Sequence, residues 1–285
     1  MSAARRRPPA SARRATRARQ RNTGSDLAAR IAVAIPAVIV AIVGIWVSPV
    51  TFAILLAAVG VAMLHELYGM LRGTRPVDLA GFLAVIGVVI AGRYGTERQV
   101  LLVLAAAVPV SFLLSSMRPP QGNAVGVMGT TLLGIYWICI PLGCAALLRE
   151  LPHGAAIITD ILVGTFVGDT GAYLGGRLFG RHPLAPTISP NKTVEGLMFG
   201  VVAGVLGVWI AGWWQNWLSG THALMLGVAV ALVAPIGDLF ESAIKRAADT
   251  KDSGRLFGAH GGALDRLDAV LFAIVAGYFV WRAVL

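Results

Sequence analysis

The stretch PIGDLFESAIKRAADTKDSGRLFGAHGGALDRLD, residues 235–268, concentrates charged side chains in a chain otherwise rich in Ala, Val, Leu, Ile and Gly. Apolar runs flank it on both sides. A chain this apolar groups so many charges for a chemical reason or at a membrane surface. The charged residues of the stretch are Asp238, Glu241, Lys245, Arg246, Asp249, Lys251, Asp252, Arg255, Asp265, Arg266 and Asp268.

The composition of all 285 residues indicates a polytopic membrane protein. Hydrophobic residues make up 56% and charged residues 13%, about half the charged share of a typical soluble domain, and the mean hydropathy is +0.74. A large soluble core would need charged helix faces, which the apolar runs lack. The two cysteines, Cys139 and Cys144, lie in an apolar run without metal or redox spacing, and we interpret them as packing residues.

The net charge of +10 comes mainly from the N-terminus, where residues 1–30 are rich in Arg. We expect residues 1–26 to form a disordered cytoplasmic tail that is attracted to anionic headgroups. A cleaved signal peptide is disfavoured because the following apolar run is long and no small-residue cleavage site ends it. An organellar transit peptide has a similar composition and remains an alternative.

Hydropathy predicts an all-α fold of about nine transmembrane helices, with the active site at the cytoplasmic face. The third predicted span is short. Residues 27–125 would form an N-terminal transmembrane region and residues 126–285 a C-terminal catalytic region. The nine predicted spans are 29–47, 49–71, 78–93, 99–117, 126–148, 156–178, 194–217, 222–245 and 264–283.

The distribution of basic residues predicts the orientation. With the N-terminus in the cytoplasm, every Lys and Arg falls on the cytoplasmic side except Arg93, Arg98, Arg149 and Arg282. This arrangement places the C-terminus outside and both charged loops, 179–193 and 246–263, inside. The expected location is a bacterial plasma membrane.

Acidic residues within spans are costly, at about 2.5–3.5 kcal/mol each near the bilayer centre. Helical spacing puts Asp238, Glu241, Ser242, Lys245 and Asp249 on one stripe, which we expect to line a polar cavity near the cytoplasmic end of its helix. Asp169, Tyr173 and, less closely, Arg177 form a shorter stripe on another predicted helix. Asp160 lies on the opposite helix face from Asp169, so the two acids should have different roles.

The turn before the last span predicts a metal site. Gly261 and Gly262 permit close backbone approach, and Asp265 and Asp268 follow on one face of the next helix. With Asp238 opposite, these carboxylates would suit Mg²⁺, which binds through a few oxygens and keeps positions for water and phosphate. The alternative is that the acids simply pair with Arg255, Arg266 and Lys251.

The only three lysines, Lys192, Lys245 and Lys251, all lie in the charged cytoplasmic segments of a chain that elsewhere uses Arg. Compact point charges of this kind are typical of phosphate contacts. The run from Ser189 to Thr193 adds hydroxyl and amide donors ahead of a helix N-terminus. Basic groups, a helix N-terminus and a cation site together indicate phosphoryl or nucleotidyl transfer on a lipid headgroup. No GxxxxGK[ST] or GxGxxG motif is present.

Two runs carry a family resemblance. They are S-x-I-K-R-x₄-K-D-x-G-x₂-F-G-x-H-G-G-x₂-D-R-L-D, residues 242–268, and GDTGAYLGGRLFGRHPLAPTISPNKTVEG, residues 168–196. Both resemble the phosphatidate cytidylyltransferases, also called CDP-diacylglycerol synthases. The resemblance is firm over 160–285 and weaker in the N-terminal half. Ala263 and Asn191 depart from the family pattern, in which a larger aliphatic residue and often Lys occupy these positions.

The resemblance implies Mg²⁺-dependent transfer of CMP from CTP to phosphatidate, with release of pyrophosphate, by a protein expected to be a homodimer. Because the positive charge lies mainly in the N-terminal tail, we expect no nucleic-acid partner. It implies Asp238, Asp265 and Asp268 as metal ligands. It implies catalytic roles for Lys245, Arg246, Lys251, Asp252, His260 and Arg266. It implies substrate contacts from Asp169, Tyr173, Ser189, Lys192, Thr193, Glu195, Ser242, Gly261 and Gly262. We assign no catalytic role to His65, His153, His182 or His222, and we interpret His65 and Glu66 as an interfacial pair.

Three other functions are alternatives. A CTP-dependent enzyme acting on another lipid phosphate or lipid alcohol has the same residue requirements. An ion-coupled transporter would need acids near mid-span and an internal repeat, and neither is evident. A CDP-alcohol phosphotransferase would need a DGxxAR run, which the sequence lacks.

Overall fold

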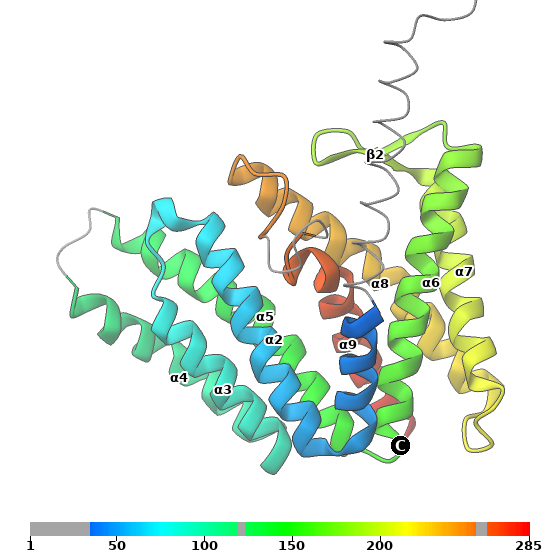
Figure 1. The fold of residues 1–285 in the computed structure, drawn as a ribbon, viewed down its shortest axis with the longest axis horizontal. Coiled ribbons are helices and arrows are strands. Elements are labelled where there is room, and N and C mark those ends of the chain that lie inside the picture. The colour runs from blue at the N-terminus through cyan, green and yellow to red at the C-terminus, as the bar shows by residue number, and fades with distance from the viewer. Residues whose placement is uncertain (1–34, 119–122, 255–260) are drawn as a thin grey trace, which may run out of the picture.

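The computed structural model describes residues 35–118, 123–254 and 261–285. The predicted disordered tail, residues 1–26, lies outside these ranges. Within them the chain is almost entirely helical, which confirms the predicted all-α fold (Figure 1). Helices satisfy their own backbone hydrogen bonds, which is the requirement for a segment that crosses lipid.

Helical residues Ile35–Val47 lead into α2 (Pro49–Met70), which Ser48 caps with Pro49 in the first turn. Next come α3 (Asp78–Tyr94), α4 (Glu97–Ser116), α5 (Ala124–Glu150) and α6 (Gly154–Phe179). After a short hairpin the chain forms α7 (Val194–Gly212), α8 (Gly220–Ala247) and α9 (Leu264–Val284).

Seven of these helices are long and apolar enough to cross a membrane: α2, α4, α5, α6, α7, α8 and α9. With 17 residues, α3 is the short third span that the sequence predicted. Many large apolar side chains are exposed on the spans, such as Leu101, Phe112 and Val202. Outward apolar side chains of this kind suit a lipid environment. The protein is a multi-pass membrane protein.

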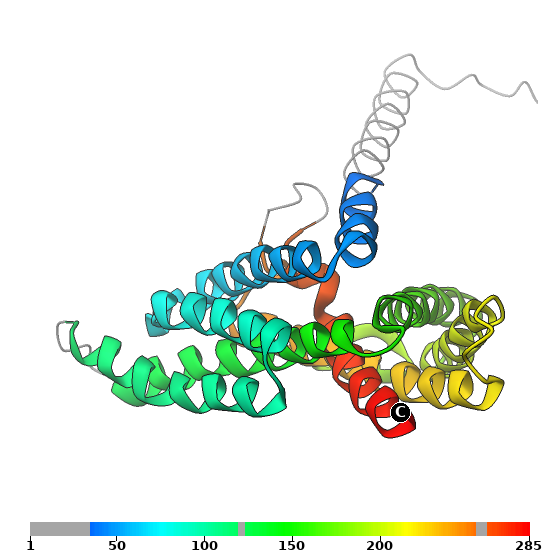
Figure 2. The same cartoon turned by 90° about the horizontal axis from the view of Figure 1, so that it is seen from below.

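The helices form two groups joined by α9. On one side α5 packs against α2, α3 and α4, and on the other α6, α7 and α8 pack together. Figure 2 shows α9 (red) between the two groups, where it contacts α8, α5 and α6. The N-terminal helices therefore meet the C-terminal region through α5 and α9.

Glycines let α6 and α7 approach closely. A Cβ at Gly168 would lie 3.3 Å from the carbonyl oxygen of Gly200, and a Cβ at Gly204 would lie 3.0 Å from that of Gly164. Glycines four residues apart, such as Gly200 and Gly204, place the side-chain-free positions on one face of α7 and permit this packing.

The loop predicted over 179–193 contains a small antiparallel hairpin of β1 (Pro183–Ala185) and β2 (Ser189–Thr193). The hairpin, the end of α8 and the end of α2 all lie at the same end of the molecule in Figure 1, opposite the C-terminus. The charged segments are thereby gathered at one end of the bundle.

Candidate functional site

The polar stripe predicted on α8 is formed as far as Lys245. Glu241 is buried, with 1% of its surface exposed, and Lys245 on the next turn lies 2.5 Å from its Oε2. Asp238 and Ser242 are half-buried, and the Ser242 hydroxyl lies 3.5 Å from Asp238 Oδ1. The stripe does not extend to Asp249 as predicted. Because α8 ends at Ala247, Asp249 lies in the following turn, exposed and with a φ of 50°.

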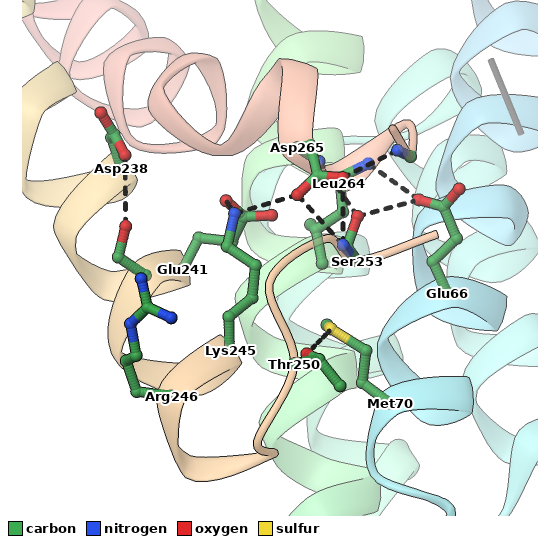
Figure 3. A network of polar contacts seen from close by, with 12 residues as sticks. Glu66, Met70, Asp238, Glu241, Lys245, Arg246, Thr250, Ser253, Leu264 and Asp265 are labelled. Carbon is green, nitrogen blue, oxygen red and sulfur yellow. Dashed lines mark hydrogen bonds and ion pairs between the residues drawn. The ribbon is translucent and has the colours of Figure 1, made fainter. Parts of the chain in front are cut away.

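Lys245 joins α8 to α9. Its ammonium donates to Oε2 of Glu241 at 2.5 Å and to Oδ1 of Asp265 at 2.9 Å. One cation is therefore held between two acids from different helices (Figure 3). Both acids are largely shielded from water, so these charge-assisted contacts are strong.

Asp265 closes the turn before α9. Its Oδ2 accepts hydrogen bonds from the Gly262 amide at 2.8 Å and the Ser253 amide at 3.0 Å. Gly261 has a φ of 83°, a left-handed conformation that glycine adopts without strain. The carboxylate of Asp265 is thus engaged by a lysine and by backbone amides from both ends of the loop.

The hairpin supplies a second lysine to this region. Nζ of Lys192 lies 2.5 Å from Oδ2 of Asp238, and Nε of Arg246 donates to the Ile188 carbonyl at 3.3 Å. Asp169 of α6 interacts electrostatically with both Asp238 and Lys192. Residues predicted from three separate segments therefore meet at one place.

Other predicted substrate contacts support the hairpin itself. Thr193 caps α7 by accepting a hydrogen bond from the Gly196 amide. Glu195 accepts from the amides of Arg181 and His182, at 3.0 and 3.2 Å. Tyr173 is exposed and accepts a hydrogen bond from Arg177, as their spacing on one stripe predicted. The contacts of Thr193 and Glu195 are those of anchoring residues, and their contact with substrate stays a prediction.

The positions of the carboxylates bear on the predicted metal site. Over the described ranges, no three or more His, Cys, Asp or Glu side chains are arranged to hold a metal ion. Asp268 is buried and interacts electrostatically with Asp238 and Glu241, and Glu241 Oε1 is buried without a hydrogen-bond partner among the described residues. These carboxylate oxygens fit Mg²⁺ in donor chemistry. Asp265 is already engaged by its neighbours, so the three-aspartate site stays a prediction.

The remaining predicted residues have fewer described contacts. Lys251, Asp252 and Arg266 are exposed beside the turn, and Ser189 begins β2. His260 and Arg255 lie outside the described residues. Within the described ranges, Asp238 and Asp265 pair with Lys192 and Lys245, and not with Lys251, the lysine named in the alternative.

The sequence interpretation missed Glu66 and Ser253. Interpreted as half of an interfacial pair, Glu66 is in fact buried, with 8% of its surface exposed, while His65 is exposed. Its Oε2 accepts from the Leu264 amide at 3.0 Å, so α2 reaches the turn before α9. The sequence feature that could have indicated this burial is an acidic residue near the end of an apolar span.

Asp160 lies away from this region, as its position on the opposite face of α6 predicted. It is buried, and its two carboxylate oxygens accept from Nε2 of Gln215 at 2.8 and 3.0 Å, in the turn between α7 and α8. Cys139 and Cys144 are buried and free, which agrees with their predicted packing role.

Comparison with known proteins supports a family assignment. The phosphatidate cytidylyltransferase of Mycobacterium bovis is 35% identical over 164 residues, which cover 57% of this chain and 53% of the relative. That of Helicobacter pylori is 48% identical over 122 residues, covering 42% and 44%. The chain thus spans about half the length of these two relatives.

A protein of the same name from Staphylococcus epidermidis is 30% identical over 228 residues, which cover 78% of this chain and 85% of the relative. The model of the cytidylyltransferase family matches residues 28–284. This match extends beyond the region 160–285 in which the resemblance was firm, through the N-terminal helices. The chain therefore belongs to the cytidylyltransferase family.

Proposed function

We propose that this protein transfers CMP from CTP to phosphatidate, giving CDP-diacylglycerol and pyrophosphate for phospholipid synthesis. The observation that carries the proposal is the pairing of Lys192 with Asp238 and of Lys245 with Glu241 and Asp265 at one end of a membrane bundle, where Arg246 also contacts the hairpin. The names of the relatives, phosphatidate cytidylyltransferase, supply the substrate pair.

In the proposed reaction, a phosphate oxygen of phosphatidate forms a bond to the α-phosphorus of CTP. The bond between that phosphorus and the oxygen leading to the β-phosphate breaks, and pyrophosphate leaves with the electron pair. The lipid phosphate is already ionised at neutral pH. Catalysis therefore needs positioning and charge neutralisation rather than a protein nucleophile.

The lysines would provide the positive charge. Lys192 extends from the hairpin and Lys245 from α8, so cations approach the site from two sides. Arg246, Lys251 and Arg266 are exposed near them and could reach the outer phosphates. The ion pairs seen with Asp238 and Asp265 would then exchange for contacts with nucleotide phosphates.

Asp238, Asp268 and Glu241 are the residues that would hold Mg²⁺, with Asp265 placed to complete the set. When bound, the ion supplies positive charge to the triphosphate and the leaving pyrophosphate. Oε1 of Glu241, buried and without a hydrogen-bond partner among the described residues, is an oxygen that such an ion could engage.

The test is incorporation of labelled CTP into lipid by the purified protein in detergent, with phosphatidate and with or without EDTA. Label in a chloroform-soluble product, requiring both phosphatidate and Mg²⁺, is the expected result. Label with a different lipid phosphate, but not with phosphatidate, would keep the chemistry and change the substrate. Label with a lipid alcohol alone would change the reaction as well, because an alcohol must lose a proton before it attacks. Absence of label with all of these lipids, for folded protein, would overturn the proposal.

We further propose that the site faces the cytoplasm, where CTP is available, with the N-terminus inside and the C-terminus outside. The bias of Lys and Arg toward that end supports this orientation. A phosphatase reporter that is active only outside the cytoplasm should work when fused after Leu285, and a fluorescent reporter that matures only inside should not. The reverse pattern would overturn the orientation. The proposed homodimer is tested separately, by the mass of the detergent-solubilised protein.

A further inference from the structure

Glu66 is a buried carboxylate to which the proposed reaction assigns no role. It lies one turn before the end of α2, in the N-terminal half of the chain, with 8% of its surface exposed. An acid in an apolar helix is costly unless it has partners. Its partners come from the other end of the sequence.

The first partner is the N-terminus of α9. Backbone amides in the first turn of a helix have no acceptor within the helix, and a capping side chain usually supplies one. The N-cap residue of α9 is Ala263, which has no such side chain. Oε2 of Glu66 instead accepts from the Leu264 amide at 3.0 Å. A carboxylate from α2 thus replaces the missing capping side chain of α9, at the positive end of the helix dipole.

The second partner is Ser253, on the other side of the loop. Its hydroxyl lies 3.5 Å from Oε2 of Glu66 and accepts from the Asp265 amide at 3.3 Å. The Ser253 amide in turn donates to both carboxylate oxygens of Asp265, at 3.0 and 3.1 Å. Figure 3 shows this succession from Glu66 through Ser253 to Asp265 and on to Lys245.

The space around the Glu66 carboxylate is closely filled. A Cβ added at Gly254 would lie 2.5 Å from Oε1 of Glu66, and one added at Gly262 would collide with Oε2. Backbone from both ends of the loop therefore packs directly on this one side chain, so its position and that of the turn are coupled.

We propose that Glu66 is a positioning residue that fixes the first turn of α9, and with it the carboxylates of Asp265 and Asp268, from outside the C-terminal region. It touches no reacting group in this arrangement. The kinetic part of the inference rests on the proposed function, whereas the structural part does not. The acceptor oxygen carries the role, so Gln should largely replace Glu and Ala should not.

The experiment compares Glu66→Ala and Glu66→Gln with wild type and with a matched control, Glu150→Gln. Glu150 is also a carboxylate at the end of an apolar helix, α5, but it pairs with Arg93 at 3.2 Å at the opposite end of the helices. Hydrogen–deuterium exchange of the Ser253 and Leu264 amides is measured in the full-length protein in detergent, without nucleotide. The Mg²⁺ concentration giving half-maximal CMP transfer is measured alongside.

In Glu66→Ala, the Leu264 amide should exchange about five- to tenfold faster, as for loss of a helix cap. The Mg²⁺ concentration for half-maximal rate should rise by a similar factor while other helices keep their protection. Glu66→Gln should lie near wild type in both measurements, and Glu150→Gln should match wild type. A purely structural role would lower the amount of folded protein without shifting the Mg²⁺ dependence.

Unchanged exchange at Leu264 in Glu66→Ala would overturn the inference, as would a Mg²⁺ dependence equal to that of wild type. A Gln variant as impaired as Ala would also contradict it, because the acceptor oxygen would then not be sufficient. If Glu66→Ala fails to fold, Glu66→Gln and Ser253→Ala test the inference in its place. Ser253→Ala should raise the Mg²⁺ concentration for half-maximal rate, and Glu66→Gln should leave it near the wild-type value. A wild type inactive on every lipid phosphate would refute the proposed function, and the exchange data would still decide the role of Glu66.

Discussion

Nζ of Lys192 and Oδ2 of Asp238 lie 2.5 Å apart, which ties the hairpin between α6 and α7 to the first residue of the polar stripe on α8. Both side chains are partly exposed, at 26% and 37%. An exposed ion pair of this kind contributes at most about 1 kcal/mol to stability. Its importance lies in placing a compact cation beside an acid where phosphate and Mg²⁺ are proposed to bind.

Lys192→Ala should therefore impair nucleotide use more than folding. Loss of one charge-assisted phosphate contact predicts a rise in the KM for CTP of about tenfold or more, with a small change in thermal unfolding. Lys192→Arg should retain part of the affinity, because the charge is kept and the shape is not. Arg98→Ala, an exposed cation of α4 far from the hairpin, is the control. Equal KM values in Lys192→Ala and wild type would remove Lys192 from the nucleotide site.

Asp265→Asn should abolish turnover while leaving the fold intact. The substitution keeps the volume but removes the negative charge that faces Lys245 and the proposed cation. Loss of one such electrostatic group predicts a decrease in rate of about 10²-fold or more, measured at saturating Mg²⁺ and normalised to folded protein. Activity close to wild type under those conditions would exclude Asp265 from the metal site.

Gly262→Ala should disturb the turn before α9 locally. Its new methyl group would meet the buried side chains of Glu66 and Ser253, which have little room to move. Overpacking at such a place costs about 1–3 kcal/mol and should lower the unfolding temperature in detergent. Gly129→Ala in α5 is the matched control, because a Cβ there meets nothing within 4 Å. Equal unfolding temperatures for the two variants would contradict the packing seen around Glu66.

Asp160→Ala should reduce stability without altering catalysis. The change leaves the partly buried Gln215 amide without its carboxylate partner, at a cost of about 1 kcal/mol. Asp160→Asn, which keeps an acceptor oxygen, should be milder. The unfolding temperature measures the first effect, and the KM for CTP and kcat per folded molecule measure the second. A change in KM would show that the turn between α7 and α8 is coupled to the opposite end of the bundle.

Local sequence signals were sufficient for part of the site. The 3.6-residue period put Glu241 and Lys245 on one face of α8, because neighbouring turns of one helix always meet. The same rule failed for Asp249, since the helix ends before it. The hairpin at 183–193 was predicted only as a loop, because its strands are too short for an alternating pattern to be recognisable.

Contacts between distant segments had no local signal. No spacing rule relates Glu66 to Leu264, or Lys192 to Asp238, because those pairs depend on which helices become neighbours. The sequence therefore predicted an interfacial position for Glu66, whereas its burial depends on the packing of α2 beside the turn before α9.

The sequence by itself determined that the chain is a bundle of membrane helices with its charges gathered at one end. In lipid, a long apolar segment must satisfy its own backbone hydrogen bonds and therefore forms a helix. Ionised side chains collect where water is accessible. The tertiary structure alone decided which acid pairs with which lysine and which residue caps α9. Those choices depend on side chains that meet across helix interfaces, where packing and hydrogen-bond geometry select the partners.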